Sequence, residues 1–112
     1  MGATPEAEGI VEVRTTFGSR DAAEACAGRV VAARLAACGQ VDGPVRSTYH
    51  WRGAVETAEE WRCTFKTTAA RAVDCVAAIV ASHPYETPEV LVATAATTPA
   101  YAAWVRESVE AV

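Results

Sequence analysis

The sequence predicts an α+β domain of the ferredoxin-like, split βαβ class, in which helices cover one face of an antiparallel sheet. Three observations support this class. Segments with the two-residue period of strands and segments with helical spacing follow one another in the order β-α-β-β-α-β-α. The two βαβ halves have similar lengths and are joined by a long hairpin, as in this motif. The right-handed crossover expected of each half leaves few other topologies.

The first predicted strand covers residues 10–17 (IVEVRTTF), where apolar and polar side chains alternate among β-branched residues. Gly18 ends the strand pattern, and Ser19 or Asp21 can cap the helix that follows. That helix is expected at residues 21–37, because small and apolar side chains recur there at helical spacing. The stripe consists of Ala23, Cys26, Val30, Ala33 and Ala37.

A long hairpin is predicted next. Residues 38–51 alternate between two faces, and residues 54–68 alternate again after the turn dipeptide Arg52-Gly53. Aromatic side chains recur at alternate positions, with Tyr49 and Trp51 on the outgoing strand and Trp61 and Phe65 on the returning strand. His50 faces away from Tyr49 and Trp51, which predicts a solvent-exposed imidazole.

The second half repeats the helix and strand pattern. An apolar stripe predicts a helix at residues 69–82, and a Val-Leu-Val core predicts a strand at residues 89–97. Pro99 suits the first turn of a last helix, expected from residue 100 to about residue 111.

The connector SHPYETPEV (82–90) is unusual because it holds two prolines. Pro84 and Pro88 fix their own φ and push the residues before them towards extended geometry. The result is a stiff elbow that displays an imidazole, a phenol and a carboxylate, namely His83, Tyr85 and Glu86. Stiff loops on a scaffold often carry binding chemistry, whereas an aromatic residue in a turn can also simply cover the core.

The bulk composition predicts one globular domain over residues 1–112, with residues 1–8 as a flexible tail. The net charge is −4 and the 10 basic residues are scattered, so we expect no nucleic-acid partner. Polar residues interrupt the apolar runs, which fall short of the roughly 20 residues of a membrane span, so no membrane partner is expected. The N-terminus lacks a secretory pattern and the four cysteines form no CxxC pair, so thiols in the cytoplasm are expected.

Five blocks in register resemble the CutA family of divalent-cation tolerance proteins, from about residue 10 to residue 105. They are RLAACGQV (34–41), VRSTYHWRGAVETAEEW (45–61), FKTT (65–68), SHPYETPEV (82–90) and PAYAAWV (99–105). The resemblance implies a compact homotrimer of ferredoxin-like subunits, similar in architecture to PII-type signalling proteins. It also implies a binding or signalling role in the response to metal ions, and no known reaction, so we expect no enzyme.

The trimer also has a physical rationale. The long hairpin leaves sheet edges that must be paired or covered, and three subunits closing edge to edge would do so. Tyr49, Trp51 and Trp61 are large apolar surfaces, which we expect at the trimer interface. The alternative is that they cover the core of their own subunit.

The metal chemistry of the family is only partly matched. Family members that bind copper use a cysteine at the end of the first strand and two histidines opening the HPY motif. Here Thr15 and Ser82 occupy two of those positions, and only His83 matches. We therefore expect weak binding of copper or another divalent cation, with His83 and Cys38 as candidate ligands, or with symmetry supplying further copies.

Two further sites are possible near the elbow. Lys66, Tyr85 and Glu86 are expected to line a small-ligand pocket at the subunit boundary, although Lys66 and Glu86 could equally form a salt bridge. An uncharacterised enzyme is the remaining alternative, with Cys38, His83 and Glu86 written as a nucleophile, a base and an orienting group. Gly-rich phosphate loops are absent from the sequence, so nucleotide binding would rest on fold analogy alone.

Overall fold

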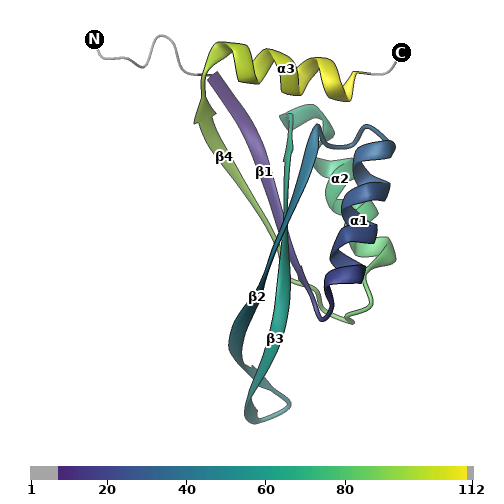
Figure 1. The fold of residues 1–112 in the computed structure, drawn as a ribbon. Helices are drawn as coiled ribbons and strands as arrows, with labels where there is room; N and C mark the ends of the chain where they lie inside the picture. Colours follow the sequence, from purple (N-terminus) through teal and green to yellow (C-terminus); the bar gives the residue numbers. More distant parts are fainter. Residues whose placement is uncertain (1–7, 111–112) are drawn as a thin grey trace, which may run out of the picture.

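The computed structural model describes residues 8–110 and contains one four-stranded antiparallel sheet with three helices. The elements are β1 (Glu8–Phe17), α1 (Arg20–Ala32), β2 (Cys38–Trp51), β3 (Ala54–Thr67), α2 (Ala69–Ser82), β4 (Val90–Thr97) and α3 (Pro99–Val109). The strand order β2-β3-β1-β4 places the two βαβ units side by side, which confirms the predicted split βαβ arrangement within this chain. Helices α1 and α2 lie on the same side of the sheet, whereas α3 crosses one end of it (Figure 1).

The core lies between the sheet and helices α1 and α2. Its members come from the face of the sheet that alternation predicts, including Val13 and Phe17 of β1 and Cys63 and Phe65 of β3. A second, smaller cluster forms where α3 packs on Ile10 of β1. The hairpin of β2 and β3 projects beyond the helices at the opposite end from α3 (Figure 1). Its tip therefore lies outside the core of the subunit.

The predicted extent of α1 is wrong at its C-terminal end, because the helix stops at Ala32 rather than continuing to residue 37. Arg34 adopts a left-handed φ of 59° and donates its backbone N–H to the carbonyl of Val31 at 3.0 Å. Leu35 donates to the carbonyl of Val30 at 3.1 Å, which completes a Schellman motif. Leu35 can then pack against the core. The helix starts one residue earlier than predicted, at Arg20, because Ser19, one of the two expected caps, accepts from the backbone N–H of Ala22 at 3.1 Å.

The other element boundaries differ from prediction by small amounts. Strand β1 begins at Glu8, which pairs with Thr97, so Glu8 does not belong to the expected tail; residues 1–7 lie outside the described region. Strand β3 ends one residue early because Thr68 caps α2. Strand β4 begins at Val90 and α3 at Pro99. The expected end of the last helix, at residue 111, lies outside the described residues.

The hairpin turn has the backbone that its sequence predicts. Arg52 and Gly53 both have positive φ, 49° and 82°, as a two-residue type I′ turn requires. Further down, the pairing of β2 with β3 shifts register between Asp42 and Val45. Such an irregularity bends the strand and so changes the direction of the outer part of the hairpin relative to the core.

Beyond the end that α3 covers, the second face of the sheet carries charged side chains. Glu12 lies within 3.9 Å of Lys66 and 3.5 Å of Arg14, and Arg62 pairs with Asp42. Strands β2 and β4 are the two edges, each with one unpaired side in the described chain. Among residues 8–110, no helix is both long enough and apolar enough to span a membrane.

Candidate functional site

The elbow after α2 is fastened to the end of β1 through His83. The Nε2 atom of His83 lies 2.8 Å from the backbone carbonyl of Thr16, and its Nδ1 atom lies 3.1 Å from the backbone nitrogen of Tyr85. A backbone N–H can only donate, so Nδ1 accepts and Nε2–H donates to Thr16. The imidazole stacks on Phe17, with ring centroids 4.3 Å apart and planes 10° from parallel. Both ring nitrogens of His83 are therefore engaged by backbone groups.

Tyr85 extends this arrangement from the elbow to β3. Its hydroxyl donates a hydrogen bond to Glu60 Oε2 at 2.8 Å, and its ring centroid lies 4.8 Å from that of His83. Burial of the phenol, the hydrogen bond to Glu60 and the charge of that carboxylate raise the pKa of Tyr85 above its usual range. A Cβ at Gly18 would lie 3.3 Å from the Tyr85 hydroxyl, so a glycine there leaves room for the phenol. Tyr85 thus stays protonated and donates.

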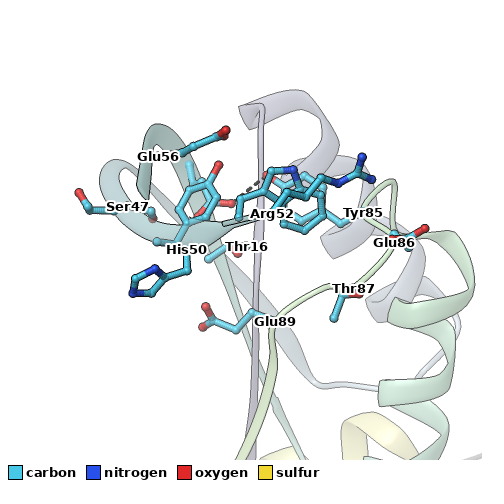
Figure 2. Close-up of a pocket in the computed structure, with 13 residues that line it drawn as sticks. Thr16, Ser47, His50, Arg52, Glu56, Tyr85, Glu86, Thr87 and Glu89 are labelled. Carbon is cyan, nitrogen blue, oxygen red and sulfur yellow. Dashed lines mark hydrogen bonds between the residues drawn. The ribbon is translucent and has the colours of Figure 1, made fainter. Parts of the chain in front are cut away.

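A cleft of about 810 Å³ opens between the hairpin and the elbow. Its aromatic members, Tyr49, Trp51 and Tyr85, are all partly exposed. Four carboxylates also line it, Glu56, Glu60, Glu86 and Glu89, against one guanidinium, Arg52, and the imidazole of His50. Figure 2 shows residues of the hairpin and residues of the elbow surrounding the same space. The guanidinium of Arg52 lies 5.2 Å from the centroid of the Trp51 ring, a cation–π distance.

Tyr85 and Glu86 lie at this cleft as expected, but Lys66 does not. Lys66 Nζ donates to Gln40 Oε1 at 2.6 Å and lies 3.9 Å from Glu12. It is six residues along β3 from Glu60, roughly 20 Å at the usual rise of a strand. Within the described chain Lys66 reaches neither Tyr85 nor Glu86 and forms no salt bridge with Glu86. The expected pocket at a subunit boundary stays a prediction.

His83 and Cys38, the two candidate metal ligands, do not meet within the described chain, and a site completed by symmetry stays a prediction. Both ring nitrogens of His83 are occupied, and Cys38 lies near α3, where its Sγ is 3.8 Å from the hydroxyl of Tyr101. In residues 8–110, no group of three or more His, Cys, Asp or Glu side chains is arranged to hold a metal ion. The expected nucleophile and base, Cys38 and His83, are also far apart. Cys38 lies level with Glu12 in the sheet, because both residues pair with Lys66. Glu12 is about 13 Å along β1 from Thr16, which is the residue that His83 contacts.

The two positions where this chain departs from the copper-binding pattern have local roles. Thr15 is buried on the core side of β1, and its hydroxyl has no partner among the described residues. Ser82 accepts a hydrogen bond from Arg29 at 2.9 Å and donates to the carbonyl of Ala78. Ser82 therefore links α2 to α1 directly behind the elbow.

The three hairpin aromatics expected at an interface divide into two groups. Tyr49 and Trp51 are 38% and 41% exposed on the projecting part of the hairpin. Trp61 instead packs against the core of its own subunit, where a Cβ at Gly43 would come within 2.7 Å of its ring. Within this chain Trp61 covers the core of its own subunit, which was the expected alternative. Its predicted place at a trimer interface is untested.

Sequence reasoning missed several residues of the cleft, above all Glu60, Glu89 and His50. Glu60 meets Tyr85 across 25 positions of sequence, and no local spacing reports that contact. His50 is exposed, as expected, and it lines the cleft together with Tyr49 and Trp51, which alternation had placed on the opposite face. The register shift after Asp42 is a feature that alternation alone does not reveal.

The remaining cysteines belong to the core. Cys26, Cys63 and Cys75 are fully buried on α1, β3 and α2. Burial raises the pKa of Cys63 to about 12 and that of Cys75 to about 11, and the pKa of Cys26 is also raised. These thiols fill space and are poor nucleophiles.

Comparison with known proteins gives a consistent result. The family described as CutA1 divalent ion tolerance protein matches residues 11–108. The divalent-cation tolerance protein CutA of Salmonella newport (strain SL254) is 35% identical over 88 residues, covering 79% of this chain and 74% of that protein.

Solved structures agree with the sequence relatives. CutA from Synechococcus elongatus PCC7942 superposes with a TM-score of 0.86 at 34% identity, covering 91% of each chain. A protein from Archaeoglobus fulgidus, named as a periplasmic divalent cation tolerance protein CutA, gives a TM-score of 0.85 at 27% identity. It covers 92% of this chain and 100% of its own.

Proposed function

Because the chain belongs to the CutA1 divalent ion tolerance protein family, we propose that it acts in divalent-cation tolerance as a homotrimer that binds, rather than converts, its ligand. The observation that carries this proposal is the closed elbow beside the open cleft. The elbow residues His83 and Tyr85 are fixed by hydrogen bonds to β1 and β3, so they present a rigid wall to a cavity rather than a mobile catalytic group.

The trimer is supported by surfaces that one subunit leaves uncovered. Both sheet edges, β2 and β4, have an unpaired side, and exposed edges are normally paired or covered in native proteins. Tyr49 and Trp51 are exposed on a hairpin that projects beyond the core. Leu91 and Val92 add exposed apolar surface along edge strand β4. Three copies joined edge to edge would cover these features, in an assembly similar to that of PII-type proteins.

Metal binding is proposed to be weak and the link to metal tolerance indirect. A tight copper or zinc site needs at least three converging donors, and His83 offers no free nitrogen while the elbow is closed. Cys38 is partly buried against Tyr101 at the other end of the sheet. Any bound copper or other divalent cation would therefore use exposed side chains such as His50 on the hairpin.

The cleft favours a second candidate function, the binding of a small organic cation. Four carboxylates and one guanidinium line the cleft, so the electric field inside the cleft attracts positive charge. Aromatic faces also bind ammonium groups, and Arg52 already occupies such a position over Trp51. The ligand would lie between the hairpin and the elbow, where we also propose the subunit boundary.

A non-enzymatic role and a cytoplasmic location complete the proposal. The residues that could form a nucleophile and base, Cys38 and His83, do not meet within the described chain. The thiols of Cys26, Cys63 and Cys75 are unpaired in the core, as suits a reducing compartment. The Archaeoglobus relative bears a periplasmic name, so fractionation of cells that express the tagged chain would test the location directly.

One pair of measurements tests the two candidate functions together. Light scattering gives the mass of the reduced protein, and calorimetry then compares Cu(II), Zn(II) and an organic cation such as spermidine on the same sample. A trimer that binds spermidine but takes up both metals only weakly supports the cleft as the binding site. A stable monomer, or a trimer that binds copper tightly and spermidine not at all, would overturn it.

A further inference from the structure

We propose that the ligand of the cleft carries a guanidinium group, and that Arg52 is its built-in competitor, a side chain that occupies the aromatic wall until the ligand displaces it. This inference rests on the second candidate function, the binding of an organic cation in the cleft. It adds the chemical group by which the ligand is recognised and the residue that controls access to the cleft.

The side chain of Arg52 lies where a ligand cation would lie. Its guanidinium carbon is 5.2 Å from the centroid of the Trp51 ring, and both residues belong to the lining of the cleft. Aromatic rings attract cations at this distance. One face of an indole holds one cation at a time, so a ligand that uses the same face must first move Arg52.

Few contacts hold Arg52 in this position. Among residues 8–110, none of the ion pairs involves Arg52, and none involves the four carboxylates that line the cleft. The contact with Trp51 is exposed, and a cation–π contact of this kind favours the stacked state by only about two- to fivefold. A ligand cation can therefore replace Arg52 at low cost.

The backbone at Arg52 is unusual for its residue type. Arg52 is the first residue of the type I′ turn and has a φ of 49°, a left-handed value that asparagine, aspartate and glycine adopt more readily. The turn alone therefore does not call for an arginine. Residues held in a disfavoured backbone region are found at binding sites more often than elsewhere, and Arg52 lies at the edge of a cleft.

The chemical group of the ligand follows from that of its competitor. A guanidinium is planar, so it stacks on an aromatic face, and its N–H groups form a fork that fits a carboxylate. The lining offers both partners, an indole face at Trp51 and four carboxylates. A primary ammonium meets the same charges but cannot stack. We therefore expect a guanidinium compound to bind more tightly than an ammonium compound of equal charge.

Two small cations test this recognition on the reduced, full-length protein. Agmatine and putrescine have the same carbon chain and the same charge, but only agmatine carries a guanidinium. Calorimetry measures the affinity of each cation. NMR of the parent protein follows the side-chain protons of Arg52, which the ring current of Trp51 shifts upfield while the two groups are stacked.

Three variants separate the competitor from its charge. Arg52→Asn removes the competitor and creates an Asn-Gly dipeptide, which is strongly favoured in type I′ turns. Arg52→Lys keeps the charge but loses the planar group. Arg46→Gln is the matched control, because Arg46 is an exposed arginine of β2 outside the cleft lining and its removal changes the net charge equally.

Agmatine should bind the parent more tightly than putrescine does. Arg52→Asn should tighten agmatine binding about tenfold, because the stacked competitor and a repelling charge are both removed. Arg52→Lys should tighten it less, because the repelling charge remains. Arg46→Gln should change it by less than about twofold, since salt screens an exposed charge outside the cleft. In the parent, the Arg52 resonances should move downfield as agmatine binds.

The two levels of the proposal can fail separately. Agmatine binding that Arg52→Asn leaves unchanged or weakens would overturn the competitor, and putrescine binding as tight as that of agmatine would overturn the guanidinium. Either result leaves a cation-binding cleft in place. Binding of neither cation by the parent or by Arg52→Asn would overturn the cleft function and this inference together. If Arg52→Asn does not fold, Arg52 resonances of the parent that stay unchanged on agmatine binding would overturn the competitor.

Discussion

The hydroxyl of Tyr85 on the elbow and the carboxylate of Glu60 on β3 lie 2.8 Å apart, and this hydrogen bond joins the elbow to the hairpin strand. Weakening this bond from either side should loosen the elbow. Tyr85→Phe removes the donor and Glu60→Gln replaces the charged acceptor by a neutral amide oxygen, so we expect each to lower the free energy of unfolding by about 1 kcal/mol, at fixed protein concentration. Urea unfolding measures both, and a double-mutant cycle should return a coupling of similar size.

The matched control is Glu59→Gln, an exposed carboxylate next to Glu60 on the same strand. It should leave the stability unchanged within about 0.5 kcal/mol. Additive effects of the Tyr85 and Glu60 substitutions, with no coupling, would contradict a direct bond between them in solution.

A pair of glycines tests the packing of the core. Gly39 on β2 has no room for a side chain, since an added Cβ would lie 2.9 Å from the ring of Phe65 and 3.1 Å from Ala27. Gly39→Ala should therefore cost about 1–3 kcal/mol through overpacking. Gly28 lies on the exposed side of α1 with open space around it, so Gly28→Ala should stabilise by up to about 1 kcal/mol. Equal effects from the two substitutions would show that the placement of β2 against α1 is wrong.

The core thiols predict a pattern of chemical reactivity. Burial raises the pKa of Cys63 to about 12, so its thiol stays protonated at pH 8. A disulfide reagent should label Cys38 first, while Cys26, Cys63 and Cys75 react only after unfolding. Mass spectrometry of labelled peptides identifies the site, and Cys38→Ser should abolish the fast phase. Fast labelling that persists in Cys38→Ser would place a core cysteine at the surface.

The same thiols give stability a dependence on alkaline pH. Their pKa values are raised on folding, to about 12 for Cys63 and about 11 for Cys75, so the folded state resists their ionisation. Their contribution is fully present below the unfolded value of about 8.5 and is lost as pH rises towards the folded values. The free energy of unfolding should fall between about pH 9 and pH 11. Cys75→Ala should reduce that slope.

The proposed trimer should be sensitive to charge on the hairpin tip. Trp51 is 41% exposed in the subunit, and an interface there would bury a glutamate without a partner, so Trp51→Glu should yield monomers or insoluble protein. Val73→Glu is the control, because Val73 is 76% exposed and lies on α2 rather than on an edge strand. Light scattering that finds Trp51→Glu as stable a trimer as the parent would exclude Trp51 from the interface.

The sequence was sufficient for the sheet but not for the end of α1. On β3, the alternation of Trp61, Cys63, Phe65 and Thr67 has the periodicity of a strand with one buried face, and those residues do face the core side. Alanines around Arg34 suit a helix as well as a turn. The helix ends there because Arg34 takes a left-handed backbone and Leu35 turns back to the core, a tertiary preference that composition does not report.

The candidate site was predictable only in part for a related reason. The two prolines of the elbow indicated a rigid loop, and Tyr85 and Glu86 do line a cleft. Its partners were not predictable, because strand register decides that Glu60 lies beside Tyr85 and that Lys66 lies far along β3 beside Glu12. The tautomer of His83 likewise depends on Thr16 and on the local backbone, which neither spacing nor composition encodes.

His83 binds the backbone of its own chain, and its ring nitrogens are therefore not available to a metal. Calorimetry of Cu(II) with the reduced, full-length protein at pH 7.5 measures this availability. We expect a dissociation constant of about 10⁻⁵ M or weaker, as for isolated surface histidines, and little change in His83→Gln protein. Submicromolar copper binding that His83→Gln abolishes would show that His83 is a metal ligand.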